Sequence, residues 1–157
     1  LATVWGVEAK RIHSIGSGID ELFSDASNTE LAPTPPGNFV LSVGRSDPRK
    51  QTRKLISSFS RLSPEERSAL RLVIVCRLDN DTRNSWLKHA QDCGLPSDQL
   101  ILTGVISDKE LRDLYSSCAV FVDTSLYEGF GLPAAEAIAC GALAITSNSS
   151  SFPEVIG

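Results

Sequence analysis

Five short apolar runs, each followed by a more polar segment, constrain the fold of this chain more than any other feature. The runs are apolar throughout rather than alternating, which is typical of strands that are buried on both faces. We expect strands at 39–43, 72–76, 100–103, 119–123 and 142–146. Because helix-like segments separate them, the pattern predicts an α/β fold with a doubly wound, Rossmann-like parallel sheet.

Helix-start and helix-stop residues mark the segments between the expected strands. Ser107 and Glu110 form a capping box, and Asp81 is the expected cap of a helix that ends before Gly94. The helices expected from these patterns cover 52–62, a short turn from 63, 82–93, 107–118, 133–140 and a further start at 151.

The first 37 residues do not follow this alternation. Residues 12–15 have the character of a short strand, and the proline-rich stretch 25–37 is typical of a surface loop. We therefore expect a linker or surface loop at 1–37 and one α/β domain at 38–157. The chain begins without methionine and stops soon after Glu154, so we expect a piece of a longer protein.

Composition excludes several classes of protein. The net charge of −4 gives no reason to expect nucleic acid as a partner. The four cysteines form no CxxC pair and show no metal-ligand spacing, so we expect no metal and read them as reduced, mostly buried side chains. Reduced cysteines are typical of a cytoplasmic protein.

Ligands of doubly wound sheets bind beyond the carboxyl ends of the strands. That rule draws attention to the loops that follow the five expected strands, at 44–50, 77–81, 104–107, 124–133 and 147–151. The residues in these loops are therefore the candidates for function.

The loop at 124–133 carries Glu128 and leads to Glu136, eight residues later and one turn into the next expected helix. Gly129 and Gly131 allow a ligand to approach the backbone, and a helix N-terminus attracts an anion such as phosphate. Glu136 suits the hydroxyl groups of a ribose. Taken alone, the two carboxylates also fit a helix-dipole partner or the acid pair of a glycoside hydrolase.

The loop at 44–50 is basic and lies at the same expected edge of the sheet. Arg45 and Lys50 are placed to contact a phosphate, whereas Arg53 and Lys54 are typical of a solvated helix face. A hydrolase has no use for a phosphate site. A nucleotide-sugar transferase needs one, because its leaving diphosphate gains charge in the transition state.

These motifs together resemble those of the retaining glycosyltransferases of the GT-B fold, family 4, also called the group 1 transferases. Residues 125–141 (SLYEGFGLPAAEAIACG) resemble the family segment with two glutamates separated by seven residues. Residues 43–50 resemble the family's phosphate loop, and 104–111 resemble its base-contacting segment. Residues 152–155 resemble the block that follows, and 10–23 resemble the passage into the nucleotide domain.

The resemblance implies a role for each matching residue. Glu136 would hold the ribose, and Glu128 would contact the donor sugar. Arg45 and Lys50 would bind the diphosphate. The remaining contacts to sugar, phosphate and base would come from Phe130, Gly131, Leu132, Val105, Ile106 and Leu111. Such enzymes use no cofactor and no metal for the chemistry, and they take UDP-, GDP- or ADP-sugars as donors.

The resemblance also implies that 1–37 is an interdomain linker, that 38–157 is the donor-nucleotide-binding domain, and that an N-terminal acceptor domain is missing. That missing domain would hold a glycan or lipid-linked acceptor, and the full protein would associate peripherally with a membrane. The isolated chain would transfer little or nothing.

Two departures stand out. Cys76-Arg77 replaces a glycine-rich turn, and Arg77 either closes over the nucleotide or is simply exposed. Asn148 and the serine run 149–151 replace a glycine-containing loop, which predicts a less close approach of this backbone to a ligand. A nucleotide-sugar-binding module without catalysis and a GT-B sugar-nucleotide epimerase remain the alternatives; the intact charged set and the spacing of the glutamates argue against them.

Overall fold

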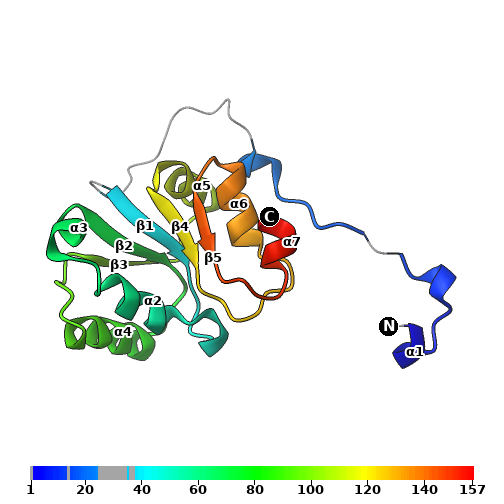
Figure 1. Ribbon diagram of the computed structural model, residues 1–157, viewed down its shortest axis with the longest axis horizontal. Helices are drawn as coiled ribbons and strands as arrows, with labels where there is room; N and C mark the ends of the chain where they lie inside the picture. The colour runs from blue at the N-terminus through cyan, green and yellow to red at the C-terminus, as the bar shows by residue number, and fades with distance from the viewer. Residues whose placement is uncertain (1, 14, 25–34, 36–37) are drawn as a thin grey trace.

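The computed structural model describes residues 2–13, 15–24, 35 and 38–157. Its centre is one five-stranded sheet in the order β3-β2-β1-β4-β5 (Figure 1). The strands are β1 (Asn38–Val43), β2 (Leu70–Val75), β3 (Leu100–Gly104), β4 (Val120–Asp123) and β5 (Ala144–Thr146). All neighbouring strands are parallel, which confirms the predicted α/β fold.

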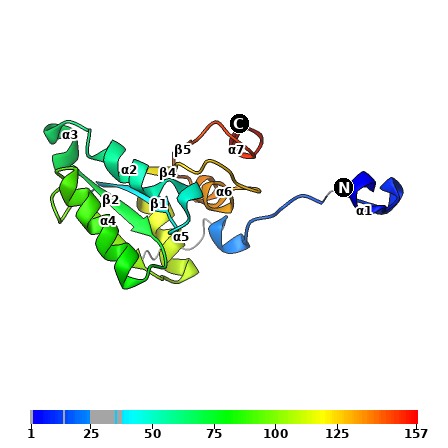
Figure 2. The ribbon, with the colours of Figure 1, turned by 90° about the horizontal axis from the view of Figure 1, so that it is seen from below.

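Helices cover both faces of the sheet: one helical layer lies below the strands in Figure 1 and the other above them, and Figure 2 views the molecule from below. The helices α2 (Thr52–Phe59) and α4 (Asn80–Asp92) pack on one face. The helices α5 (Asp108–Ser117) and α6 (Leu132–Ala139) pack on the other. Leu72 of β2 faces the first layer and Val73 the second, and both are fully buried. A strand between two helical layers has no polar face, which explains the uniformly apolar runs.

Shorter elements complete the chain. They are α1 (Ala2–Trp5), η1 (Ala9–Arg11), η2 (Glu21–Phe23), η3 (Pro48–Lys50), α3 (Pro64–Ser68) and α7 (Phe152–Ile156). Figure 1 shows α1 away from the sheet, whereas η2 lies against α5 and α6. Phe23 is buried there, with its ring centroid 5.9 Å from that of Tyr115. The predicted domain boundary at residue 38 stays a prediction.

Two sequence-based expectations about secondary structure are wrong. Asp79, not Asp81, caps α4, because its backbone is extended and its Oδ1 accepts a hydrogen bond from the Thr82 amide at 2.7 Å. Asp81 lies in the first helical turn instead. Among the described residues, Ile12, His13 and Ile15 form no strand, and all five strands of the sheet come from residues 38–146. The loop predicted at 25–37 lies outside the described residues except for Pro35.

Several boundaries differ by a few residues for tertiary reasons. β2 begins at Leu70 rather than at 72, because Leu70 and Arg71 pair with the first residues of β1. α2 ends at Phe59, and Pro133 is the second rather than the first residue of α6. β5 is shorter than expected.

The cysteines are only partly as predicted. All four are free thiols, as expected. Only Cys76 is buried, however, while Cys93, Cys118 and Cys140 are half-exposed. The last two follow the ends of α5 and α6, where a helix leaves the core and its final residues reach the surface.

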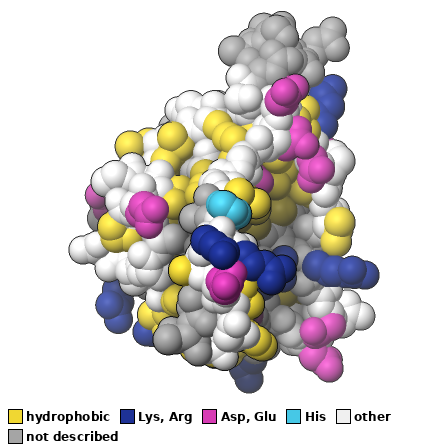
Figure 3. All heavy atoms as spheres, turned by 90° about the vertical axis from the view of Figure 1, so that its right-hand side faces the viewer, with side chains coloured by type: hydrophobic (Ala, Val, Ile, Leu, Met, Phe, Trp, Pro, Cys, Tyr) yellow, Lys and Arg dark blue, Asp and Glu magenta, His cyan; other side chains and the backbone are white. Residues whose placement is uncertain are grey.

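Acidic and basic side chains are interspersed across the face shown in Figure 3. Within the described part of the chain, every helix is too short or too polar to cross a bilayer.

Candidate functional site

The loops after β1 and β4 meet at the point where the chain changes direction across the sheet. β1 continues the sheet through β2 on one side and lies beside β4 on the other. In doubly wound folds this switch point opens a crevice at the carboxyl ends of the strands. The first loop carries Arg45 and Lys50, and the second carries Glu128, so the fold brings these predicted residues to one place.

Lys50 is the buried centre of this site. Its side chain is 7% exposed, and its Nζ lies 2.9 Å from Oε1 of Glu128 and 3.2 Å from Oδ2 of Asp123. The short helix η3 positions it: Asp47 caps the start and Gln51 ends it in a left-handed conformation with φ of 53°. A buried ammonium group needs such partners, because leaving it unpaired away from water is costly.

Arg49 contacts the carboxylate of Glu128 from the solvent side. Its Nη1 lies 2.9 Å from Oε1 of Glu128. The separations are those of ion pairs, although neither cation is aligned with Oε1 as a hydrogen-bond donor. Burial raises the pKa of Glu128, but Lys50, Ser125 and Arg49 outweigh it and hold that pKa below its usual value. Glu128 is therefore a carboxylate at neutral pH.

Backbone contacts fix the two loops to each other. Thr124 Oγ1 donates to the carbonyl of Lys50 at 3.0 Å, and the Leu126 amide donates to the carbonyl of Arg49 at 2.9 Å. Serines of the loop after β5 brace the other side: the Glu128 amide donates to Ser150 Oγ at 2.8 Å, and Ser151 Oγ donates to the carbonyl of Phe130 at 2.9 Å. The serine run thus holds the loop that carries Glu128.

A cavity of about 310 Å³ lies in front of the N-terminus of α6. It combines residues from both loops with the start of this helix. Its lining includes the predicted site residues Arg45, Lys50, Glu128, Phe130, Gly131 and Leu132. Gly131 has φ of +91°, a conformation that side chains disfavour, and it directs the chain into α6. The space is suited to an anionic group.

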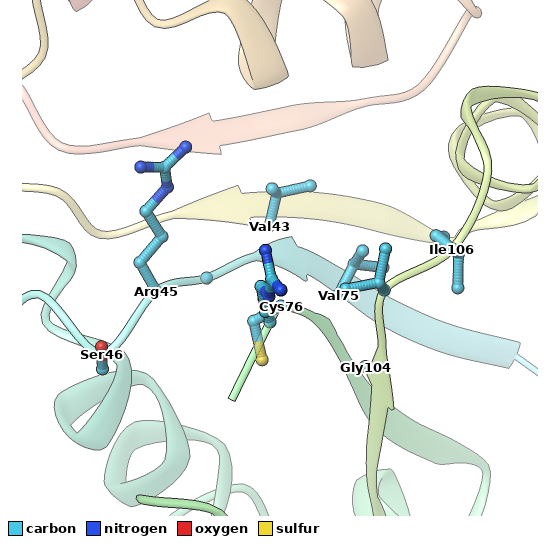
Figure 4. Close-up of a pocket in the computed structure, with 10 residues that line it drawn as sticks. Val43, Arg45, Ser46, Val75, Cys76, Gly104 and Ile106 are labelled. Atoms are coloured by element: carbon cyan, nitrogen blue, oxygen red, sulfur yellow. The ribbon is translucent and has the colours of Figure 1, made fainter. Parts of the chain in front are cut away.

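A second cavity of about 620 Å³ extends from Arg45 past the ends of β2 and β3. Figure 4 shows Arg45 at one end and Ile106 at the other, with Val43, Val75 and Cys76 between them. Val105 also lines it and is 73% exposed. The predicted base-contacting segment therefore borders a space that can hold a planar ring.

Two predicted site residues line neither cavity. Leu111 packs against the hydrophobic core on the α5 side. Glu136 faces Tyr115, whose hydroxyl donates to Oε2 at 3.1 Å. Burial raises the pKa of Glu136 above its usual value, and the hydrogen bond from Tyr115 opposes that shift only in part. The predicted contacts of Leu111 with a base and of Glu136 with a ribose stay predictions.

Comparison with known proteins identifies the family. The model of the family described as "Glycosyl transferases group 1" matches residues 19–157. The chain belongs to this family. A relative from Escherichia coli, a serotype-specific mannosyltransferase called WbdA, is 36% identical over 158 residues, or 96% of this chain and 19% of its own length. This group 1 transferase chain therefore spans about a fifth of that relative.

A second relative and a solved structure agree with this assignment. A GDP-mannose:cellobiosyl-diphosphopolyprenol alpha-mannosyltransferase from Komagataeibacter xylinus is 31% identical over 151 residues, covering 96% of this chain and 37% of its own length. The C-terminal domain of the group 1 protein LpcC from Francisella tularensis has a TM-score of 0.68 at 25% identity, covering 87% and 74% of the two chains. The chain is thus similar to the C-terminal domain of GT-B transferases.

Sequence reasoning about this group 1 transferase missed two charged residues. Asp123 ends β4, and its 2% exposed side chain binds Lys50 and the amide of Ser125. The sequence held a signal for Asp123, because a carboxylate at the end of an apolar strand indicates a buried charge that needs a partner. Arg49 was included in the basic loop, but its pairing with Glu128, 79 residues away in the chain, has no sequence pattern. Among the described residues, no cluster of histidine, cysteine and acidic side chains is arranged to hold a metal ion.

Replacing Glu136 with glutamine tests its protonation. A raised pKa means that the protonated form contributes stability below the unfolded-state pKa, near 4.3, and that this contribution is lost as pH rises through the folded-state pKa. Glu136→Gln removes that loss. In urea titrations we expect the free energy of unfolding of the variant, relative to that of the native chain, to be higher at pH 8 than at pH 4. The exposed Glu154→Gln is the control; an equal difference at both pH values for Glu136→Gln would contradict the expectation.

Proposed function

We propose that this chain is the donor-binding part of a retaining glycosyltransferase that moves a mannosyl residue from a nucleoside-diphosphate mannose to a glycan or lipid-linked acceptor. The names of both relatives support the sugar, and the name of one supports GDP-mannose as the donor. The acceptor is bound by a part of the protein outside this chain, in keeping with its coverage of 19% and 37% of those relatives.

One observation carries the proposal: Arg45, Lys50 and Glu128 surround a single cavity at the N-terminus of α6. The diphosphate lies between Arg45 and that helix end, where cation and helix dipole both favour negative charge. Glu128, held ionised by its two cations, accepts hydrogen bonds from the hydroxyls of the sugar. The nucleoside extends into the larger cavity toward Val105 and Ile106.

The reaction assigned to this site needs no covalent enzyme intermediate. The bond between the sugar C1 and the diphosphate oxygen breaks while C1 bonds to an acceptor hydroxyl oxygen on the same face, so that the configuration is retained. The acceptor proton passes to the departing phosphate. Arg45 and Lys50 stabilise the charge that develops on that leaving group, which is the largest requirement of such a step.

Calorimetry on the full chain tests the assignment. We expect GDP to bind and GDP-mannose to bind more tightly, since the sugar adds contacts with Glu128. Glu128→Gln should remove most of the advantage of GDP-mannose over GDP, a loss of roughly 1–3 kcal/mol for hydrogen bonds to a charged group.

The control for that experiment is Glu65→Gln, which changes an exposed carboxylate on α3. It should leave both affinities unchanged. Binding of GDP and GDP-mannose with equal affinity to the native chain would overturn the role of Glu128, and binding of no nucleoside diphosphate at millimolar concentration would overturn the donor site.

A further inference from the structure

Arg77 is a charged residue of the large cavity to which the proposed chemistry assigns no role. It is the second residue after β2, separated from Val75 by Cys76, and is exposed. Of the ten residues that line the cavity of about 620 Å³, only Arg45 and Arg77 carry a charge. The remaining lining is mostly apolar side chains and glycine, including Val105 and Ile106. A lone guanidinium group on such a wall is placed to recognise part of a ligand.

The positions of the two arginines divide the cavity into two ends. Arg45 lines both cavities, so it lies where the large one joins the smaller one that contains Glu128 and Lys50. Arg77 lines only the large one. Cys76, its neighbour in the chain, lies between Arg45 and Ile106 in Figure 4. If the diphosphate lies at the junction, Arg77 belongs with the nucleoside rather than with the phosphates.

Nearby acidic and thiol groups do not neutralise Arg77. Asp79 is the nearest carboxylate along the sequence, and it caps α4: its two oxygens accept hydrogen bonds from the amide and the hydroxyl of Thr82, at 2.7 Å and 3.0 Å. Burial raises the pKa of the Cys76 thiol to about 11, so that group is uncharged at neutral pH. In the described part of the chain, Arg77 forms no ion pair.

The chemistry of the base edges selects one partner for such a group. Guanine presents two adjacent acceptors, O6 and N7, which match the two parallel N–H donors of a guanidinium group. Adenine presents N7 beside an amino group, which opposes a second donor, and uracil presents O4 beside C5–H, which offers no second acceptor. Val105 and Ile106 supply the apolar surface against which the ring lies.

We propose that Arg77 selects guanine as the base of the donor nucleotide by a paired hydrogen bond to O6 and N7. The inference rests on the proposed function, because it takes the cavity to be the nucleoside site. It also explains the departure after β2, where Cys76-Arg77 replaces a glycine-rich turn. Glycine has no side chain to contact the base, whereas Arg77 supplies its guanidinium group.

Nucleotide analogues test the paired bond in calorimetry with the full chain. IDP keeps O6 and N7, so we expect it to bind almost as well as GDP. 7-Deaza-GDP and ADP each lose one of the two matches and should bind roughly tenfold more weakly or worse. In Arg77→Ala the affinity for GDP should fall to that for 7-deaza-GDP. Arg77→Lys keeps the charge but lacks the two parallel N–H donors, so it should recover little of the preference for GDP over 7-deaza-GDP.

The control variant is Lys54→Ala, which removes an exposed cation outside the large cavity and should change no ratio. The proposal is overturned if the penalty for 7-deaza-GDP persists in Arg77→Ala, or if that variant loses affinity for GDP, UDP and ADP alike, as a phosphate contact would. Failure of the donor-site assignment looks different, because the native chain would then bind none of these nucleotides.

Discussion

Replacing Lys50 with methionine should lower the free energy of unfolding by about 3–5 kcal/mol, the usual cost of leaving one member of a buried ion pair alone. Lys50 is 7% exposed, and its Nζ is the cation that faces Asp123, itself 2% exposed. Glu128 keeps Arg49 as a partner, but Asp123 keeps only its hydrogen bonds from Ser125. The same variant should lose most of its affinity for a nucleoside diphosphate.

A double-mutant cycle separates the buried charge from other effects of the substitution. Adding Asp123→Asn to Lys50→Met removes both charges, and replacement of a whole buried pair is often close to neutral. We therefore expect the double variant to recover much of the stability but none of the nucleotide affinity. Lys54→Met, on the exposed face of α2, is the matched control. Equal stability of the single and double Lys50 variants in urea titrations would refute the pairing as the cause.

Gly131→Ala should destabilise the chain by about 3 kcal/mol. The left-handed backbone, with φ of +91°, contributes about 1 kcal/mol, and overpacking contributes roughly 1–3 kcal/mol more. The new methyl group would lie 2.7 Å from Cε1 of Phe152, a ring that is 1% exposed and cannot move into solvent. Since Gly131 leads from the loop of Glu128 into α6, donor binding should weaken as well.

Alanine variants of two other glycines separate the backbone cost from the cost of the contact with Phe152. Gly141 has φ of +86° but open space around an added methyl group, so Gly141→Ala should show only the backbone cost of about 1 kcal/mol. Gly129 lies in the same loop as Gly131, with open space and no left-handed φ, and its alanine variant should be nearly neutral. Thermal and urea unfolding of the three variants should rank them in this order; equal losses at Gly131 and Gly141 would exclude the contact with Phe152.

The charged loops illustrate how far the sequence leads. The parallel-sheet rule places Arg45, Lys50 and Glu128 at one edge, and the structure brings all three to one cavity. Their pairing was not predictable. Lys50 was expected to contact a phosphate, yet it lies between two carboxylates, because a buried ammonium group requires anionic partners. Those partners, Asp123 and Glu128, are 73 and 78 residues further along the chain, too far for a local pattern to indicate them.

The serine run after β5 shows the opposite case. Its lack of glycine looked like a loss of close backbone approach to a ligand. In the structure Ser150 and Ser151 form hydrogen bonds with the Glu128 loop, so the run supports the site from behind. Side-chain hydrogen bonds between loops follow no sequence period, which is why only coordinates reveal them.

The sequence by itself determined the sheet, its parallel strands and the loops at its carboxyl edge, because burial on two faces and helix caps impose local patterns that can be read along the chain. The tertiary structure alone decided the partners of Lys50, Glu128 and Glu136, and the space beside Arg77. The physical reason is that ion pairing and cavity shape depend on distances between residues far apart in sequence, on which local patterns place no constraint.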